Sequence, residues 1–446
     1  MNQTRTLCDF LAGMSPERIG EENLKDIRYK LLDWLGCCVA AQGRPAQKKA
    51  ADLLLRQGGN PMATAVGLPD KTGTHEAAFY NGMISHLLEY DDTNKIAITH
   101  PGAPVIAAAL AVAEAENADF SLFACGVASG YEAMIRLGGA VNPDHYEYWH
   151  TTGTCGAFAA AAAAARIMRL DGEQTERAFG IAATMASGLV GVFGTEAKLV
   201  TVGNAARNGI IAAELAQAGY SAPVDGFAGE KGYARAANGK EDLSFMVPKP
   251  GDPLMLEDAY YKMHASCGHT HSALDALQGL LSDNPVKAGE VESAAVEVYR
   301  TAEKLCAGYA TETEIQAKFS MPYCVACMLR FGQVTLSEFS ETALRDPVTA
   351  ELARRVEVKE SPAFTAAYPS LRTEKVTLRL KDGRVLSAQV DLPVGRPPYA
   401  FIEKKFDALA GMNLSPEKCA EIRSAVLGLA ANDSLSGVCG IVRSLT

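Results

Sequence analysis

The sequence has 446 residues, of which 48% are hydrophobic and 21% are charged, and its formal net charge is -10 at pH 7. This composition excludes a disordered or fibrous chain, and the length allows two or three domains. The acidic balance argues against nucleic acid as a partner, because such binding needs a basic face, so an anionic ligand would need locally clustered cations.

Membrane and export signals are missing from the sequence pattern. No uncharged apolar run approaches membrane-spanning length, and the first twenty residues lack the apolar core of a signal peptide. The eleven cysteines are an odd number without the spacing of a disulfide scaffold. Cys37, Cys38, Cys155 and Cys327 stand among apolar residues, where free thiols pack as small hydrophobes. We expect a reduced, cytoplasmic protein with no membrane partner.

Helical spacing dominates the first part of the chain. In residues 22–41, Ile27, Leu31, Trp34 and Leu35 recur at spacings of three and four, which predicts a helix with one core face. Residues 86–115 place two histidines and three acids ahead of an apolar helical run. Residues 153–188 predict two alanine-rich helices joined at residues 170–172, whose small side chains allow close helix packing.

The pattern changes after about Lys262. Residues 269–281 predict a helix, residues 291–300 alternate like a strand, and residues 374–392 predict a hairpin that turns at Asp382 and Gly383. Helical spacing returns at the C-terminal end of the chain. We therefore expect a mainly α protein, with a large all-helical domain of residues 1–261 and 399–446 and an inserted α+β domain of residues 262–398. The cleft between such domains is the natural place for a ligand.

The common cofactor motifs are missing as well. The segments SGLVGVFG and GFAGEKG contain glycines but fit neither the dinucleotide fingerprint nor the phosphate loop. Cys267, His269 and His271 alternate at a spacing of two, which in an extended segment would put three metal ligands on one side. No second pair with finger-like spacing accompanies them, so a metal is the weaker interpretation.

Five motifs, in order, carry a resemblance to a known family. They are YNGMISHLLEYDDTNKIAITHPGAPVIAAALAVAE, YWHTTGTCGAFAAAAAAARIMRLD, FGTEAKLVTVGNAARNGIIAAELAQAGY, THSALDAL and KFSMPYCVA. Together they resemble the successive motifs of the MmgE/PrpD family, from about Asp26 to Leu409. That family includes 2-methylcitrate dehydratase, cis-aconitate decarboxylase and iminodisuccinate epimerase. The resemblance implies a helical domain built from both chain ends, an α+β lid domain, a homodimer, and chemistry without metal or organic cofactor.

The resemblance also implies which residues form the site. The implied catalytic residues are His100, His150, Lys198, His271 and Tyr323. The implied substrate-binding residues are Asp92, Thr93 and Glu89. This sequence departs from many members at two places, since Glu89 replaces an aspartate and Thr201 replaces a histidine. Either change could alter which acid is accepted.

The chemistry of the family explains these residue types. Dehydration, decarboxylation and epimerisation beside a carboxylate all develop negative charge near a carboxyl group. Histidine can move the proton near neutral pH, and a lysine such as Lys198 can pair with a carboxylate or a developing anion. Tyr323 could give its hydroxyl proton to a leaving group.

Several functions stay open at this point. The leading hypothesis is a lyase for a small di- or tricarboxylic acid, most similar to 2-methylcitrate dehydratase. A cis-aconitate-type decarboxylase and an epimerase of a substituted succinate such as iminodisuccinate are the nearest alternatives. A pyridoxal phosphate enzyme using Lys198 lacks a phosphate cup. A non-catalytic carboxylate-binding protein would not need so many titratable groups.

Each site residue also has a purely structural alternative. Asp91, Asp92 and Thr93 could cap a helix or stabilise a turn. His86 and Glu89, three residues apart on a predicted helix, could form a local pair or face solvent. Lys198 could be a solvated surface lysine, and Tyr323 a core tyrosine with one hydrogen bond. His86 and His269 are left out of the predicted catalytic set.

Overall fold

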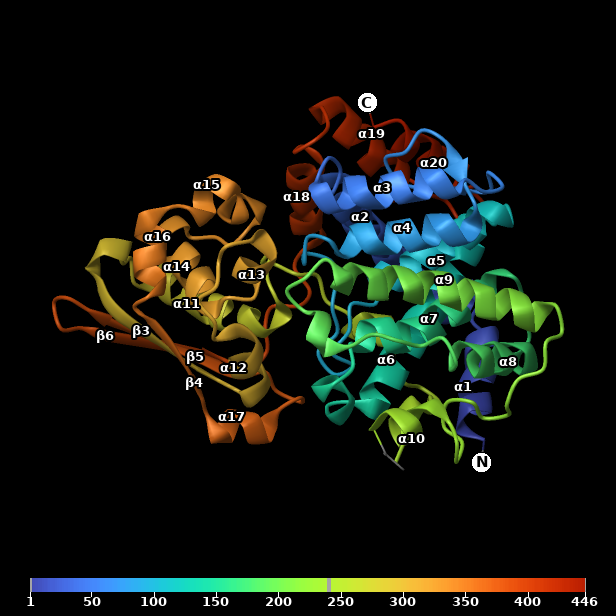
Figure 1. Cartoon of the computed structure of the whole chain (residues 1–446), viewed down its shortest axis with the longest axis horizontal. Coiled ribbons are helices and arrows are strands. Elements are labelled where there is room, and N and C mark those ends of the chain that lie inside the picture. Colours follow the sequence, from blue (N-terminus) through green and yellow to red (C-terminus); the bar gives the residue numbers. More distant parts are fainter. Residues whose placement is uncertain (1, 239–241, 446) are drawn as a thin grey trace. The chain divides into compact units, whose positions relative to one another are not determined.

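The computed structural model describes residues 2–238 and 242–445 and shows a mainly α-helical chain, as the sequence predicts. The chain divides into two compact units (Figure 1). The first unit comprises Met1–Tyr261 and Pro397–Thr446, and the second comprises Lys262–Arg396. Across the described residues, none of the helices combines the length and the apolar character needed to cross a membrane.

The first unit is built almost entirely of helices, with one short pair of antiparallel strands. Its elements are α1 (Gln3–Ala12), α2 (Pro16–Ala40), α3 (Pro45–Gln57), β1 (Ala63–Thr64), β2 (Lys71–Thr72), α4 (Thr74–His86), α5 (Gly102–Ala115), α6 (Phe120–Val141), α7 (Thr151–Ile167), α8 (Gly172–Ala182), α9 (Ala197–Gln217), α10 (Tyr233–Asn238), α18 (Tyr399–Ala410), α19 (Pro416–Leu427) and α20 (Ser436–Arg443).

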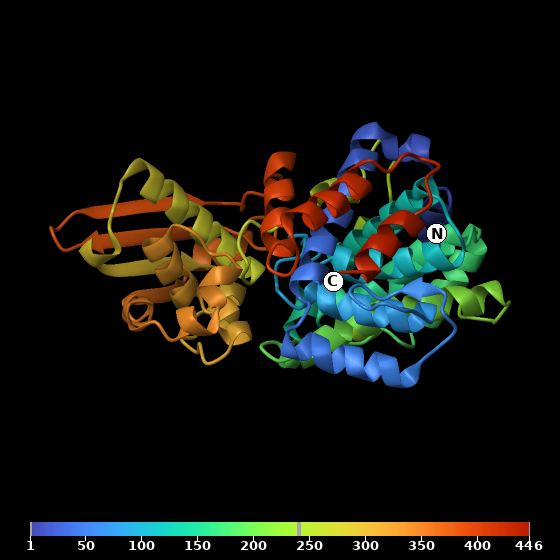
Figure 2. The ribbon, with the colours of Figure 1, turned by 90° about the horizontal axis from the view of Figure 1, so that it is seen from above.

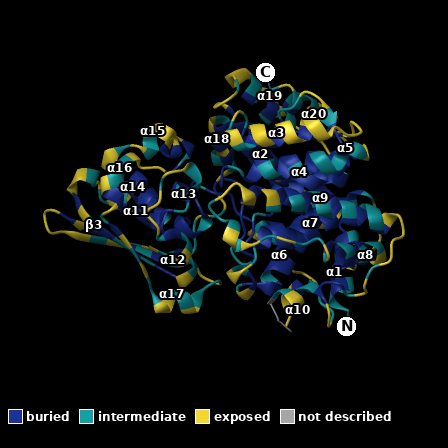
Figure 3. Ribbon diagram, in the orientation of Figure 1, coloured by how far each residue is buried: buried dark blue, intermediate teal, exposed yellow. Residues whose placement is uncertain are grey.

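The predicted helical periodicity of the first unit is confirmed. In α2 the four predicted core residues are all buried, and the helix begins with Ser15 accepting a hydrogen bond from the main-chain N–H of Arg18. The predicted joint between two helices separates α7 from α8, where Asp171 forms a capping box with Gln174. Figure 3 shows that α5, α6 and α7 are almost entirely buried.

Small residues let α7 and α9 pack closely, as the alanine-rich sequence predicts. At Gly209 of α9, an added Cβ atom would lie 2.4 Å from Cβ of Ala160 on α7. Such a contact is too short for any side chain, so only glycine permits this approach. The close approach matters because both helices begin at residues of the candidate site described below.

The two ends of the chain meet within the first unit. Figures 1 and 2 show the C-terminal helices, in red, beside the N-terminal helices, in blue. Helix α18 packs on α2, and Phe406 of α18 lies so close to Gly36 of α2 that an added Cβ would be 3.3 Å from its ring. Residues from the two ends of the chain, such as Leu35 and Phe406, therefore share one core.

The second unit combines a twisted sheet with short helices. Its elements are α11 (His271–Asp283), β3 (Val291–Val298), α12 (Arg300–Cys306), α13 (Glu314–Lys318), α14 (Met321–Phe331), α15 (Glu341–Leu344), α16 (Pro347–Ala353), β4 (Val356–Glu360), α17 (Pro362–Ala367), β5 (Glu374–Leu380) and β6 (Val385–Val390).

The predicted strand, hairpin and helix of the second unit are confirmed. The strand order is β4-β3-β5-β6, with β3 and β4 parallel and the other two pairs antiparallel. The β5–β6 hairpin turns at Asp382 and Gly383, and Gly383 has a φ of 90°, which glycine adopts without strain. Helices α11 and α14 pack on one another and on strands of this sheet.

All eleven cysteines are buried. The four that the sequence predicts to pack as small hydrophobes have no exposed surface: Cys37, Cys38, Cys155 and Cys327. Burial raises the pKa of the Cys155 thiol to about 12, so the thiolate does not form near neutral pH.

Candidate active site

Charged and polar side chains gather in the first unit where four helices begin or end. Helix α4 ends at His86, and α5 begins two residues after His100. His150 is the N-cap residue of α7, and Lys198 lies in the first turn of α9. The His86 ring centroid lies 4.7 Å from that of His100 and 6.1 Å from that of His150. The structure therefore brings together the predicted residues His100, His150 and Lys198.

The turn after α4 differs from the sequence prediction. The sequence predicts His86 and Glu89 on one helix, but α4 ends at His86, and Glu89 has a φ of 52° in the left-handed region. Both side chains are buried rather than facing solvent, and His86 Nε2 lies 3.7 Å from Glu89 Oε1. Asp91 accepts a 2.8 Å hydrogen bond from His86 Nδ1. The left-handed conformation of Glu89 turns the main chain, so that the side chains of Glu89 and Asp91 both face buried partners.

His100 is held by the main chain of its own segment and by α7. Its Nδ1 donates a 3.0 Å hydrogen bond to the main-chain oxygen of Asp92. Its main-chain N–H donates to Thr152 Oγ1 at 3.2 Å. Because a carbonyl oxygen can only accept, Nδ1 carries a proton, and in the neutral form of the ring the lone pair lies on Nε2.

The hydrogen bonds of His150 fix its tautomer in the same way. Thr201 Oγ1 donates its single proton to the main-chain oxygen of Lys198 at 2.7 Å. Thr201 Oγ1 also lies 2.8 Å from His150 Nδ1. Because the proton of Oγ1 is already engaged, Oγ1 accepts a hydrogen bond from that nitrogen. Burial, followed by the nearby charges of Lys198, His86 and His100, holds the pKa of His150 well below its usual value. His150 is therefore a neutral imidazole whose basic atom is Nε2.

Lys198 is buried and paired, which contradicts the alternative of a solvated surface lysine. Its side chain is only 5% exposed, and its Nζ donates to Glu89 Oε1. The ammonium also lies 4.9 Å from the ring centroid of Phe193. The added length of glutamate relative to aspartate helps the carboxylate of residue 89 reach this ammonium.

Three helix N-termini meet at the site. Helices α5, α7 and α9 all begin within or directly after the segments that carry His100, His150 and Lys198. Each N-terminus carries the positive end of a helix dipole, and in α5 the first N–H, that of Gly102, is already bonded to Asp92. Together with the Lys198 ammonium, they make this region attractive to an anion despite the negative net charge of the whole chain.

Asp92 and Thr93 have structural partners. Asp92 accepts from the N–H of Gly102, the first residue of α5, at 2.8 Å and from the hydroxyl of Tyr131 at 2.6 Å. Burial raises the pKa of Asp92 to about 6. Thr93 donates its hydroxyl to the main-chain oxygen of Thr99 at 3.0 Å. The helix-capping alternative thus holds for Asp92, and substrate contact by Asp92 and Thr93 stays a prediction.

His271 and Tyr323 lie in the second unit. His271 begins α11, and its Nε2 lies 3.3 Å from the main-chain oxygen of Ser266, to which it donates. Burial, with His264 and Lys262 adding to it, lowers the pKa of His271 well below its usual value. Tyr323 donates its hydroxyl to the main-chain oxygen of Glu338 at 2.6 Å, and burial raises its pKa. In this structure the Tyr323 proton is therefore engaged within the core.

The extended metal-binding segment proposed for the second unit is wrong in its geometry. Residues Gly268–Thr270 form a 3-10 helix and His271 begins α11, so Cys267, His269 and His271 do not alternate along an extended strand. His269 instead shares a 2.6 Å hydrogen bond with the hydroxyl of Tyr299.

Another set of potential metal ligands lies in the first unit. Within the described residues, one ligand atom each from His86, Glu89 and His100 lie within 4.8 Å of one another. Imidazole and carboxylate suit several divalent metals. However, Glu89 Oε1 already accepts a hydrogen bond from the Lys198 ammonium. A metal ion here would have to compete with that positive charge.

Sequence reasoning missed part of this cluster. The predicted catalytic set does not include His86, which is completely buried and bonded to Asp91. Thr201 was noted only as a departure from the family, yet it orients His150. The short spacing of His86, Asp91 and His100 in sequence was a usable signal, whereas the contact between His150 and Thr201 spans 51 positions.

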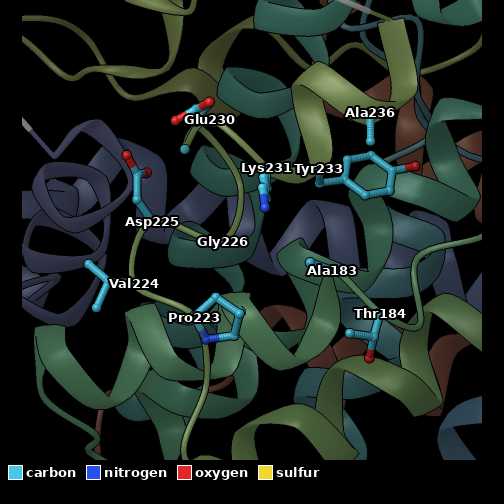
Figure 4. A pocket seen from close by; sticks show the side chains of 13 residues that line it. Ala183, Thr184, Pro223, Val224, Asp225, Gly226, Glu230, Lys231, Tyr233 and Ala236 are labelled. Atoms are coloured by element: carbon cyan, nitrogen blue, oxygen red, sulfur yellow. The ribbon is translucent and has the colours of Figure 1, made fainter.

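A separate pocket in the first unit shares none of these residues. It has a volume of about 300 Å³ and is lined by the end of α8 and by residues 223–236. Figure 4 shows its charged residues, Asp225, Glu230 and Lys231, together with Pro223 and Tyr233. Asp225 is engaged with Thr4 of α1. None of the residues that line this pocket is a histidine, in contrast to the site at the helix ends.

The fold and the site define a helical protein with a buried lysine, histidine and acid cluster suited to an anionic ligand. Sequence comparison agrees with this class: residues 5–246 match the MmgE/PrpD N-terminal domain, and residues 264–430 match the MmgE/PrpD C-terminal domain. The chain therefore belongs to the MmgE/PrpD family, and the predicted resemblance is confirmed.

Relatives with assigned names cover nearly the whole chain. The chain is 27% identical over 459 residues to a cis-aconitate decarboxylase of Aspergillus terreus, covering 96% of this chain and 93% of the relative. It is 25% identical to the cis-aconitate decarboxylase of Homo sapiens, covering 92% and 88%. It is 24% identical to the cis-aconitate decarboxylase of Mus musculus, covering 92% and 87%.

Proposed function

We propose that this protein is a cofactor-independent lyase that decarboxylates a small unsaturated tricarboxylic acid of the cis-aconitate type. The names of the relatives support decarboxylation over dehydration, which is the leading hypothesis from the sequence. We also propose that His271 and Tyr323 take part in catalysis, that the second unit acts as a lid, and that the protein works as a homodimer in the cytoplasm.

The observation that carries this proposal is the combination of anion attraction with neutral imidazoles. The positive ends of three helix dipoles and the Lys198 ammonium attract substrate carboxylates to this region. His150, whose pKa is held low by burial and neighbouring positive groups, can accept a proton there. A site that only bound carboxylates would not need a buried imidazole with a fixed tautomer.

The proposed reaction needs one proton and a place for negative charge. Breaking the bond between carbon and the departing carboxylate leaves an electron pair that spreads through the neighbouring double bond toward another carboxylate. The Lys198 ammonium stabilises that charge. A bound polyanion raises the pKa of nearby imidazoles, so His150 can take up a proton when substrate binds and deliver it to carbon.

A panel of acids tests the proposed function directly. The purified protein is given cis-aconitate, 2-methylcitrate, citrate and iminodisuccinate separately, and the products are followed by proton NMR. We expect loss of carbon dioxide from cis-aconitate. Water loss from 2-methylcitrate with no decarboxylation would instead establish the dehydratase, and epimerisation of iminodisuccinate would establish the isomerase. Tight binding of an acid without any turnover would support the carboxylate-binding protein.

Exhaustive chelation is expected to leave turnover unchanged. The reason is that the Lys198 ammonium, rather than a metal ion, neutralises Glu89 in the cluster. The measurement compares kcat before and after dialysis against a strong chelator, with metal content checked by mass spectrometry. A loss of activity that a divalent metal restores would assign His86, Glu89 and His100 as ligands.

Thr201→Val is expected to lower kcat about tenfold, the scale of one hydrogen bond. Valine keeps the shape of threonine but removes the oxygen that accepts from His150 Nδ1, so the ring loses its fixed tautomer. Thr201→Ser keeps that oxygen and is expected to retain most of the turnover. Wild-type kcat in Thr201→Val would show that this hydrogen bond does not orient a catalytic group.

A further inference from the structure

A buried lysine from the last part of the chain contacts the turn that carries the acids of the site. Lys405 lies on α18, and its Nζ donates a 2.7 Å hydrogen bond to the main-chain oxygen of Tyr90. The same Nζ lies 2.8 Å from Oδ1 of Asp33 on α2 and 4.1 Å from the ring centroid of Tyr90. Both charged side chains are only 2% exposed.

The charged state of this lysine follows from its partners. Burial lowers the pKa of Lys405, but the negative charge of Asp33 and the hydrogen bond to it outweigh burial, so the pKa is raised overall. The group that contacts Tyr90 is therefore an ammonium. A charge-assisted hydrogen bond of this kind is stronger and more directional than a neutral one.

Tyr90 lies in the chain between Glu89 and Asp91, the two acids that contact Lys198 and His86. Glu89 has a φ of 52°, a strained conformation for a residue other than glycine, and it pairs with Lys198. Asp91 instead bonds to His86. Strained backbone of this kind persists only where the surrounding structure holds it, and it concentrates at functional sites. The Tyr90 carbonyl is the point where Lys405 can hold this reversal.

Stability alone does not account for the buried pair. Removing two charges from water is costly, and apolar pairs of similar volume often replace buried ion pairs without loss of stability. An apolar pair, however, cannot donate a hydrogen bond to the Tyr90 carbonyl. The pair of Asp33 and Lys405 therefore supplies what an apolar pair lacks, which is a hydrogen-bond donor held at a fixed position beside the Tyr90 carbonyl.

We propose that Lys405 and Asp33 are positioning residues of the candidate active site. Lys405 fixes the Tyr90 carbonyl and so sets the directions of the neighbouring Glu89 and Asp91 side chains, while Asp33 holds Lys405 in place. Neither residue contacts the substrate. The kinetic consequence rests on the proposed function, whereas the effect on the backbone of the turn does not.

The double variant Asp33→Val/Lys405→Met separates positioning from stability. It removes both charges together, so neither is left buried and unpaired, and the melting temperature is expected to fall less than after the loss of Lys405 alone. We expect kcat to fall about ten- to a hundredfold, as for a small misplacement of catalytic groups, with a smaller change in KM. A folded double variant with wild-type kcat would overturn the proposal.

Amide hydrogen exchange gives a second measurement that needs no substrate. In Asp33→Asn, which keeps the size of the side chain but removes its charge and replaces one oxygen by an NH2 group, amides of residues 89–100 are expected to exchange about tenfold faster. Unchanged exchange in this segment would overturn the proposal even if the double variant failed to fold. If the wild type turned over none of the acids, the proposed function would fail, and this exchange measurement would still decide whether the pair holds the turn.

Arg136→Met is the matched control. Arg136 forms another buried ion pair of the first unit, with Glu132 at 2.7 Å, and its second acidic partner is Asp252. Its loss is expected to lower the melting temperature but to leave kcat of the folded protein and exchange in residues 89–100 unchanged. If Arg136→Met altered both, the effect would belong to any lost buried pair, and the specific role of Lys405 would be refuted.

Discussion

His150→Ala is expected to fold like the wild type and to lose about a hundred- to ten-thousandfold in kcat, the usual contribution of a proton-transferring side chain. The structure gives the reason: His150 is a neutral, buried imidazole with Nδ1 committed to Thr201, so its other nitrogen is prepared to carry a proton. Steady-state kinetics on the acid identified by the panel, together with the melting temperature, measure the effect.

His75→Ala is the control for this variant. His75 lies in the same unit and pairs with Glu214 at 2.7 Å, but its ring is 33% exposed and it belongs to none of the site contacts described above. It should keep wild-type kcat. Turnover by folded His150→Ala at the wild-type rate would remove His150 from the mechanism.

Lys198→Ala is expected to lower kcat about a hundredfold or more, the scale seen when one electrostatic donor to a developing anion is removed. The variant also leaves the buried carboxylate of Glu89 without its ammonium partner. Lys198→Arg keeps the charge with a different shape and reach, so we expect a smaller loss. The kcat values and melting temperatures of both variants separate lost charge from lost folding.

Two further measurements sharpen the assignment of Lys198. Lys49→Ala removes an exposed lysine whose Nζ lies 2.8 Å from Oε2 of Glu196. Glu196 is close to Lys198 in sequence, but Lys49 belongs to none of the site contacts, so this variant should leave kcat unchanged. Borohydride treatment during turnover should trap nothing on Lys198, because the proposed role is electrostatic. A trapped adduct on Lys198, found by peptide mass spectrometry, would show a covalent mechanism instead of the electrostatic role. Equal kcat for wild type and Lys198→Ala would refute the role of this residue altogether.

Local patterns predicted most of the secondary structure that matters for this site. The core face of α2 followed from the spacing of Ile27, Leu31 and Trp34, and the β5–β6 hairpin followed from its Asp-Gly turn. Such features depend on neighbours a few residues apart. The family motifs then added His100, His150 and Lys198, which the structure brings together in the first unit.

The remainder depends on contacts that local patterns do not contain. Helical spacing continued past His86, but the chain leaves the helix there because Glu89 takes a left-handed conformation and finds Lys198 in the packed structure. The bond from Lys405 to the Tyr90 carbonyl spans 315 positions and involves a main-chain atom, so no side-chain motif marks it. Periodicity shows which faces are buried but not which buried polar groups meet.

The contact between α18 and the turn after α4 has a consequence for the order of events during synthesis. The ribosome makes the helices that carry His86, His150 and Lys198 long before it makes Lys405, and all of the second unit is translated in between. N-terminal segments generally begin to fold while the rest of the chain is still being made. In the nascent chain, Asp33 is therefore present before the lysine with which it pairs. A ribosome stalled just before residue 399 would hold a chain with every histidine and the lysine of the cluster already made, yet with the backbone of the acidic turn still lacking its last support.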